Sequence, residues 1–283
     1  MEEKHEDHTY AIRHSTDKTI VHDHCYSMVV DKKFSLDMEY ADDMTSVTND
    51  PKINDFKRDH TKRLLKQSNL SINIDKTETF EIKRSGNEEW KNCKLLGSLL
   101  DTENDIQRRK GLAVAAINTM KNMFYGKVLF SIKLRAFNCY VSSIFLYNCE
   151  LWTLTETTKN MIDAFHRRLL RTACLNIKWP KVIKNDDLYT VTKAVPWSHV
   201  IAKRQFSWFG HLARLPDDTP AKLSLDYVQN VTTKKPRGRQ KTTWISMITA
   251  NFSKLGLTWN EAYDIAKNRN EWKDITRRFL LLS

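Results

Sequence analysis

The segment from Phe34 to Val47 places the strongest constraint on the fold. Apolar and polar residues alternate strictly at its start, in the order Phe34, Ser35, Leu36, Asp37, Met38, Glu39 and Tyr40. A period of two is typical of a half-buried strand. Asp42 and Asp43 interrupt the alternation, and residues 44–47 predict a returning strand. We therefore expect a tight hairpin that carries two adjacent carboxylates at its tip.

Two interpretations of the paired carboxylates are open. Hard divalent cations such as Mg²⁺ take oxygen ligands from one or two carboxylates together with substrate phosphates. Two such ions can activate the attacking oxygen and stabilise the leaving oxygen in phosphoryl transfer. However, Asp residues are also common in turns, where they tolerate the backbone geometry and are well solvated. The spacing of Asp42 and Asp43 alone does not decide between these interpretations.

Composition indicates a helix-rich intracellular protein. The chain has 283 residues, enough for one large or two modest domains, and its 7 Gly and 6 Pro argue against long disordered linkers. It has no apolar run long enough for a transmembrane helix, and its polar N-terminus has no signal-like apolar stretch. The five cysteines are scattered without a CxxC pair. We expect reduced thiols and a nuclear or cytoplasmic protein that is not secreted.

Positive charge is concentrated in the second part of the chain. The formal net charge is +12; residues 160–283 contain 22 Lys and Arg against 10 Asp and Glu, whereas the preceding residues balance. Such asymmetry favours a polyanionic partner, most often nucleic acid, and no membrane partner is expected. A solvated basic surface is the alternative.

The pattern beyond the hairpin predicts an α+β region followed by helices. Apolar spacing predicts a helix over 53–67, then a strand over 70–74, an extended segment over 79–83 and a short strand at 95–97. Further helices are expected over 102–125, 132–152, 158–175, 244–252 and 259–281. The segment over 203–214 interleaves basic and aromatic residues, which suits either nucleic-acid contact or a core helix.

The first 33 residues are polar and rich in His. We expect them to connect to the hairpin, because the group His22-Asp23-His24-Cys25 matches no standard zinc spacing and has no second ligand pair.

The hairpin motif Tyr40-Ala41-Asp42-Asp43 resembles the catalytic core motif of reverse transcriptases. The following order extends the resemblance to the late palm of non-LTR (LINE-type) retrotransposon reverse transcriptases. The segments 73–77 and 95–98 resemble an Asn-x-x-Lys-Thr element and a YLGS strand, with Leu95 where Tyr is commoner.

The resemblance continues to the end of the chain. Residues 145–155, FLYNCELWTLT, and 165–171, FHRRLLR, are similar to the thumb-side region of that family. Residues 203–214 and 234–241 and the terminal Trp-containing helices are similar to its tail. The resemblance covers about 34–283 and implies a partial palm at 34–100, a helical thumb-like region at 101–178 and a basic helical region at 179–283, after the polar segment 1–33.

What the resemblance implies is RNA-directed DNA polymerisation on an RNA template and DNA primer. Asp42 and Asp43 would be the catalytic, metal-binding residues for Mg²⁺ or Mn²⁺, and Tyr40 would lie beside the template and primer. Lys76, Leu96 and Gly97 would contact nucleotide or primer. The expected nucleic-acid contacts are Arg108, Arg109, Lys110, Arg167, Arg168, Arg171, Lys203, Arg204, Trp208, Lys234, Lys235, Arg237, Arg239 and Lys241.

The family also uses another metal-binding aspartate from an earlier palm strand. No Asp before Tyr40 lies in a matching apolar strand. Asp42 and Asp43 alone would lack the bridging carboxylate that fixes two ions. We therefore expect an N-terminally truncated reverse-transcriptase fragment that does not polymerise alone. The alternatives are a non-catalytic nucleic-acid-binding protein and the product of a decayed element.

Overall fold

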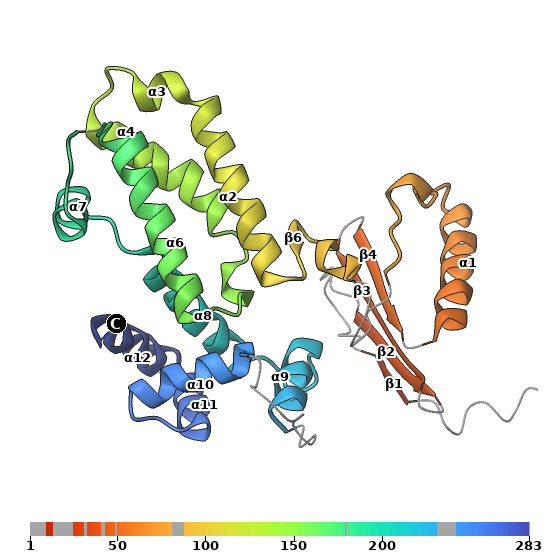
Figure 1. Cartoon of the computed structure of the whole chain (residues 1–283). Coiled ribbons are helices and arrows are strands. Elements are labelled where there is room, and N and C mark those ends of the chain that lie inside the picture. Colours follow the sequence, from red (N-terminus) through yellow and green to blue (C-terminus); the bar gives the residue numbers. More distant parts are fainter. Residues whose placement is uncertain are drawn as a thin grey trace, which may run out of the picture. The chain divides into compact units, whose positions relative to one another are not determined.

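The computed structural model describes residues 10–13, 25–30, 33–40, 43–48, 50–80, 88–178, 180–230 and 242–282. Figure 1 shows one group of strands and a larger group of helices. The chain divides into two compact units, one of residues 1–81 with 217–223 and the other of residues 82–216 with 224–283. The fold contains strands and helices but is mostly helical, which agrees with the expected α+β class at this coarse level.

The first unit contains a four-stranded antiparallel sheet with the strands in sequence order. Its strands are β1 (Tyr10–Arg13), β2 (Cys25–Val30), β3 (Lys33–Tyr40) and β4 (Asp43–Thr48). The pairing of β3 with β4 confirms the predicted hairpin. By contrast, β1 and β2 fall within the polar segment 1–33 and pair with the sheet, so this segment is more than a connector.

Helix α1 (Pro51–Gln67) confirms the helix expected over 53–67. Its start is encoded locally, since Pro51 opens the helix and the Asp50 carboxylate accepts a hydrogen bond from the Lys52 backbone N–H (2.9 Å). The helix packs beside β4. The strand expected over 70–74 is wrong: residues 70–73 form no ladder, and Ile74–Lys76 is a 3₁₀ turn, η2. The Asn73 side chain accepts from the Lys76 N–H and so competes with an extended backbone.

The second unit begins with a 3₁₀ turn η3 (Glu89–Asn92) and a small hairpin of β5 (Lys94–Leu95) and β6 (Ser98–Leu99). Its regular helices are α2 (Thr102–Thr119), α3 (Lys121–Tyr125), α4 (Phe130–Ala136), α5 (Ser143–Phe145), α6 (Glu156–Leu169), α7 (Asn185–Thr192), α8 (Trp197–Ala213), α10 (Trp244–Lys254), α11 (Trp259–Lys267) and α12 (Arg269–Leu282). Helix α9 (Pro220–Asn230) includes residues of both units.

Local capping explains several helix starts. Asp101 accepts from the Asn104 N–H at the start of α2, and Thr155 accepts from the Thr158 N–H at the start of α6. Helices α10 and α11 begin with reciprocal capping boxes, at Thr243 and Thr258. These four helices lie within or close to ranges expected from apolar spacing.

The helix expected over 132–152 is shorter and less regular than predicted. Helix α4 passes into a π-helical segment η4 (Phe137–Ser142) and then α5, which ends at Phe145. Asn148 has a left-handed backbone (φ 54°), and a 3₁₀ turn η5 (Cys149–Leu151) follows. The expected helix over 158–175 also ends in a π-helical segment, η6 (Leu170–Cys174). The expected burial of the segment 132–152 holds only in part: Phe137, Val141 and Phe145 are buried, whereas Cys139, Tyr140 and Tyr147 are exposed. Continuous apolar sequence could not reveal these changes of turn, which decide the face that each side chain occupies.

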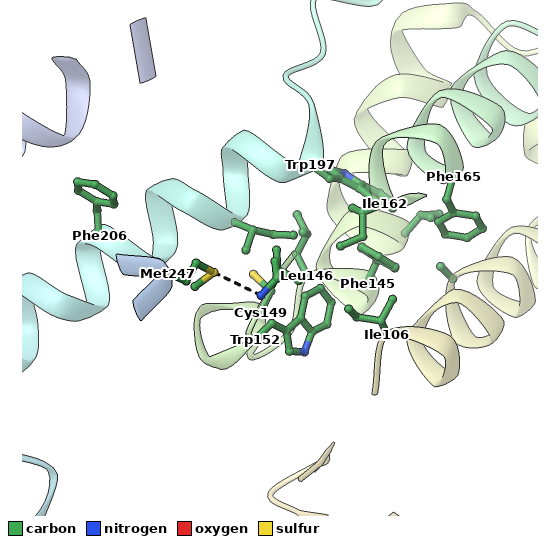
Figure 2. Packing of buried hydrophobic residues seen from close by; sticks show 14 of the residues in the cluster. Ile106, Phe145, Leu146, Cys149, Trp152, Ile162, Phe165, Trp197, Phe206 and Met247 are labelled. Carbon is green, nitrogen blue, oxygen red and sulfur yellow. Dashed lines mark hydrogen bonds between the residues drawn. The ribbon is translucent and has the colours of Figure 1, made fainter. Parts of the chain in front are cut away.

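One aromatic cluster joins the helices of the second unit. Figure 2 shows Trp197 of α8 against residues of α5 and α6. The Trp197 ring stacks on Phe145 with centroids 4.3 Å apart and on His166 with centroids 4.4 Å apart. Further along α8, Phe206 stacks on Trp272 and Phe279 of α12. Helix α8 therefore packs on the earlier helices α5 and α6 and on the later helix α12.

In the part of the chain that the structure describes, no helix combines the length and apolarity needed to cross a membrane.

Candidate functional site

Strands β3 and β4 flank the two-carboxylate motif and pair with each other. Strand β3 ends at Tyr40 and β4 begins at Asp43, and these two residues are register partners. Asp43 is exposed. Asp42 lies outside the described residues. The antiparallel pairing of β3 with β4 agrees with the hairpin that the alternating sequence predicted.

The strand register bears on whether a third carboxylate is near. Position 43 pairs with position 40, and position 37 pairs with position 46. Because successive strand positions alternate between faces, positions 37 and 43 belong to opposite faces of the sheet. Positions 37 and 43 therefore do not share a face of the β3–β4 hairpin. Within the described ranges, no group of three or more His, Cys, Asp or Glu residues could hold a metal ion.

Lys76 ends the exposed 3₁₀ turn η2 in the first unit. Its backbone N–H is held by the Asn73 side chain (3.2 Å), while the Lys76 side chain is exposed. The segment 73–77 is thus a capped turn and not the end of a strand. Its lysine is accessible, as a phosphate contact would require.

Leu96 and Gly97 form the turn between β5 and β6, where the sequence predicted a strand. Their backbones are left-handed, with φ of 45° and 80°. The Tyr147 hydroxyl donates to the Leu96 carbonyl (2.9 Å), and Arg108 and Arg109 donate to the Gly97 carbonyl (3.0 and 2.8 Å). The helical unit therefore fixes both carbonyls of this turn.

Arg109 is a structural residue and not a surface contact for nucleic acid. Its side chain is 4% exposed and pairs with the buried Asp105 carboxylate (3.1 Å). It also donates to the Ile144 carbonyl and the Ser98 hydroxyl. With its donors used inside the unit, Arg109 has no free face for a phosphate, which corrects the sequence-based expectation for this residue.

The other basic residues of α2 and of the α6–η6 region differ in accessibility. Arg168 is exposed, and Lys110, Arg167 and Arg108 are half-buried. Arg171 donates to the Ile183 carbonyl and the Asn185 side chain, which fixes the segment before α7. Lys110 and Arg168 both approach the Phe165 ring, with Nζ at 5.7 Å and Cζ at 5.3 Å from its centroid.

An open groove of about 560 Å³ lies beside these two cations. It is lined by Lys110, Gly111, Val114, Ala164, Phe165 and Arg168, from α2 and α6. Burial lowers the pKa of Lys110, and the positive charge of Arg168 lowers it further. The sequence showed the basic residues but not the groove, because two helices that are far apart in the sequence form it.

Helix α8 contains the residues expected to contact nucleic acid over 203–214. Lys203 is exposed, but Arg204 donates to the Leu146 carbonyl (2.5 Å). Trp208 is half-buried against His211, and Leu212 is buried. This segment is a core helix with some exposed cations on its surface. Lys234, Lys235, Arg237, Arg239 and Lys241 lie outside the described residues.

Two buried features are not apparent from the sequence. By pattern alone, Asp105 belongs to an acidic first turn and His166 to a basic helix. His166 is 2% exposed, and burial together with the nearby Arg167 lowers its pKa to about 3. The neighbouring apolar positions Ile162 and Leu169 were the available signal that this face of α6 is core.

Comparison of the chain with protein-family models, with curated proteins and with solved structures finds no match.

Proposed function

We propose that this chain is the late-palm, thumb and tail portion of a non-LTR retrotransposon reverse transcriptase, and that alone it binds nucleic acid without polymerising. The observation that carries this proposal is the hairpin: the motif Tyr40-Ala41-Asp42-Asp43 occurs where β3 ends and β4 begins, with Tyr40 opposite Asp43. A reverse-transcriptase core motif requires such a turn. A helix or an open loop at this motif would have argued against it.

The carboxylates argue against independent polymerisation. Two-metal nucleotidyl transfer needs preorganised negative charge that holds both ions. Asp43 is exposed, and Asp37 belongs to the other face of the sheet. The family chemistry, in which Mg²⁺ or Mn²⁺ stabilises the attacking and leaving oxygens, would therefore require a carboxylate from elsewhere.

Charge supports nucleic-acid binding. The excess of Lys and Arg lies in residues 160–283. Arg168 and Lys203 are exposed on helices. Lys and Arg that neutralise phosphates supply sequence-independent affinity for nucleic acid. A binding protein derived from the same region, with no catalytic role, is the second candidate, and the same charge distribution favours it.

The test is primer extension on a homopolymer RNA template with purified chain and Mg²⁺ or Mn²⁺, with Asp42→Asn as the comparison. We expect no extension by either protein and salt-dependent binding of the same primer and template by the unaltered chain. Extension that is lost in Asp42→Asn would mean that the chain completes its own metal site. Absence of both extension and binding would reject the proposed function.

A further inference from the structure

The groove between α2 and α6 carries two cations that have no ion-pair partner in the described part of the chain. The salt bridges of α2 and α6 in that part involve Arg108, Arg109 and Lys159. Lys110 and Arg168 instead share the Phe165 ring. Their mutual repulsion contributes to the lowered pKa of Lys110. Two like charges held on one ring leave a local excess of positive charge that an anion would relieve.

The helices hold this arrangement in place. Phe165 is 7% exposed and packs on Phe145 and Trp197, so the core fixes its position. The Gln107 amide reaches the Met161 sulfur across the two helices, one turn before the groove. Lys110 and Arg168 therefore lie on two helices whose spacing is fixed by the core.

The wall of the groove leaves room for a ligand. A methyl group added at Gly111 would have no heavy atom within 4 Å. The groove volume is about 560 Å³, which exceeds the space that one phosphate group needs. Because the Phe165 ring is buried, it offers the ligand little stacking surface. The groove therefore presents charge to a ligand and no exposed ring on which a base could stack.

We infer that Lys110 and Arg168 bind a backbone phosphodiester group of a nucleic-acid strand in the groove between α2 and α6. This inference rests on the proposed nucleic-acid binding for the source of the phosphate, and it assigns the contact to two residues on two helices. Arg168 can present several N–H donors to phosphate oxygens, and Lys110 adds a point charge.

The binding test uses the full chain and a fluorescein-labelled single-stranded oligonucleotide, followed by anisotropy between 50 and 200 mM salt. The variant is Lys110→Gln with Arg168→Gln. The control is Lys273→Gln with Arg278→Gln, which removes the same charge from exposed positions of α12. Removing one cation that neutralises a phosphate reduces the steepness of log K against log salt by about 0.7 on a single strand. Because Lys110 and Arg168 share one phosphate, we expect the groove variant to reduce that slope by about 0.7 and to bind at least tenfold more weakly than the control at low salt.

A second measurement, by NMR, locates the bound oligonucleotide on the chain. The chain has 7 glycines, so ¹⁵N-glycine labelling gives a simple spectrum in which loss of one signal in Gly111→Ala identifies Gly111. We expect the oligonucleotide to shift the Gly111 signal and to leave in place the signal of Gly256, which lies between α10 and α11 and does not line the groove. Inorganic phosphate is the second probe, and we expect it to shift Gly111 only at far higher concentration than the strand.

The outcomes separate this inference from the proposed function. If the unaltered chain binds no oligonucleotide, the proposed function fails and the inference falls with it. If the chain binds but the groove variant matches the α12 control, or Gly111 stays unshifted, the inference alone is overturned. Tight binding of inorganic phosphate that the strand cannot displace would also overturn it, since the groove would then be a site for the free anion.

Discussion

The Asp105 carboxylate accepts a hydrogen bond from the Trp152 indole Nε1 at 3.0 Å, across 47 residues of sequence. The same carboxylate pairs with Arg109 and accepts the Leu99 backbone N–H. Asp105 is 1% exposed, so a single buried charge joins the β5–β6 hairpin, α2 and the segment that precedes α6.

Asp105→Asn should destabilise the second unit strongly, because it leaves the Arg109 guanidinium buried without a compensating charge. Breaking a buried ion pair by removing one partner costs about 3–5 kcal/mol. Urea unfolding followed by tryptophan fluorescence measures the change. The control is Asp264→Asn, whose exposed pair with Lys267 is worth at most about 1 kcal/mol. A destabilisation below about 1 kcal/mol in Asp105→Asn would contradict the assigned role.

Replacing glycine by alanine should change the stability of the chain in opposite directions at two helical positions, Gly210 and Gly111. Gly210 of α8 lies against the Trp272 indole, and a methyl group there would clash with the ring. Gly210→Ala should therefore destabilise the chain by about 1–3 kcal/mol, the usual cost of overpacking. Gly111→Ala in α2 meets open space and should stabilise it by about 0.5–1 kcal/mol. Thermal unfolding of the two variants compares them, and equal shifts in Tm would refute the packing described for α8 and α12.

His166 should make the chain sensitive to acid. Its pKa is about 3 in the folded state against an ordinary value of 6.5, because burial disfavours the charged ring. The unfolded state therefore takes up the proton first, and stability contributed by neutral His166 is full above pH 6.5. That stability falls as pH drops toward 3, by about 1.4 kcal/mol for each pH unit within the window.

The substitution His166→Phe removes the titrating imidazole and keeps an aromatic ring stacked on Trp197. The free energy of unfolding, measured by urea titration between pH 7 and 4.5, should fall less with pH in His166→Phe than in the unaltered chain. The control is His211→Phe, which makes the same substitution at an exposed histidine. Identical pH dependence in all three proteins would show that His166 does not titrate as described.

The cysteines should differ in reactivity. Cys139 is exposed, whereas Cys149 and Cys174 are buried and burial raises the pKa of each to about 12. Thiolate is the reactive form, so iodoacetamide at pH 8 should label Cys139 in minutes and should not label Cys149 or Cys174 in the folded chain. Peptide mass spectrometry gives the labelled positions, and unfolding in urea should expose all three. Early labelling of Cys174 in the folded chain would contradict the burial of η6.

The β3–β4 hairpin and α1 were predictable because their signals are local. The strict alternation before Asp42 predicts a strand, and Asp50-Pro51 predicts a helix start. Neither signal depends on distant residues. The apolar stripes of α2, α6 and α10 were readable for the same reason. The strand expected over 70–74 failed because a local Asn73 hydrogen bond outweighed its alternation.

The features that sequence analysis missed depend on contacts between distant segments. The role of Arg109 is set by Asp105 one turn away and by the Gly97 and Ile144 carbonyls, which only the folded unit brings together. The π-helical turns and the groove beside Phe165 likewise have no local signature. The sequence showed that α2 and α6 carry basic residues. It could not show that Arg168 is exposed and Arg109 is buried, because exposure depends on tertiary packing.

The most direct test of the account is equilibrium binding of the full chain to a fluorescent primer and RNA template, measured by anisotropy from 50 to 200 mM salt. We predict saturable binding whose log K falls linearly with log salt, as expected when cations neutralise phosphates. Binding that is absent at 50 mM salt, or that is indifferent to salt, would contradict it.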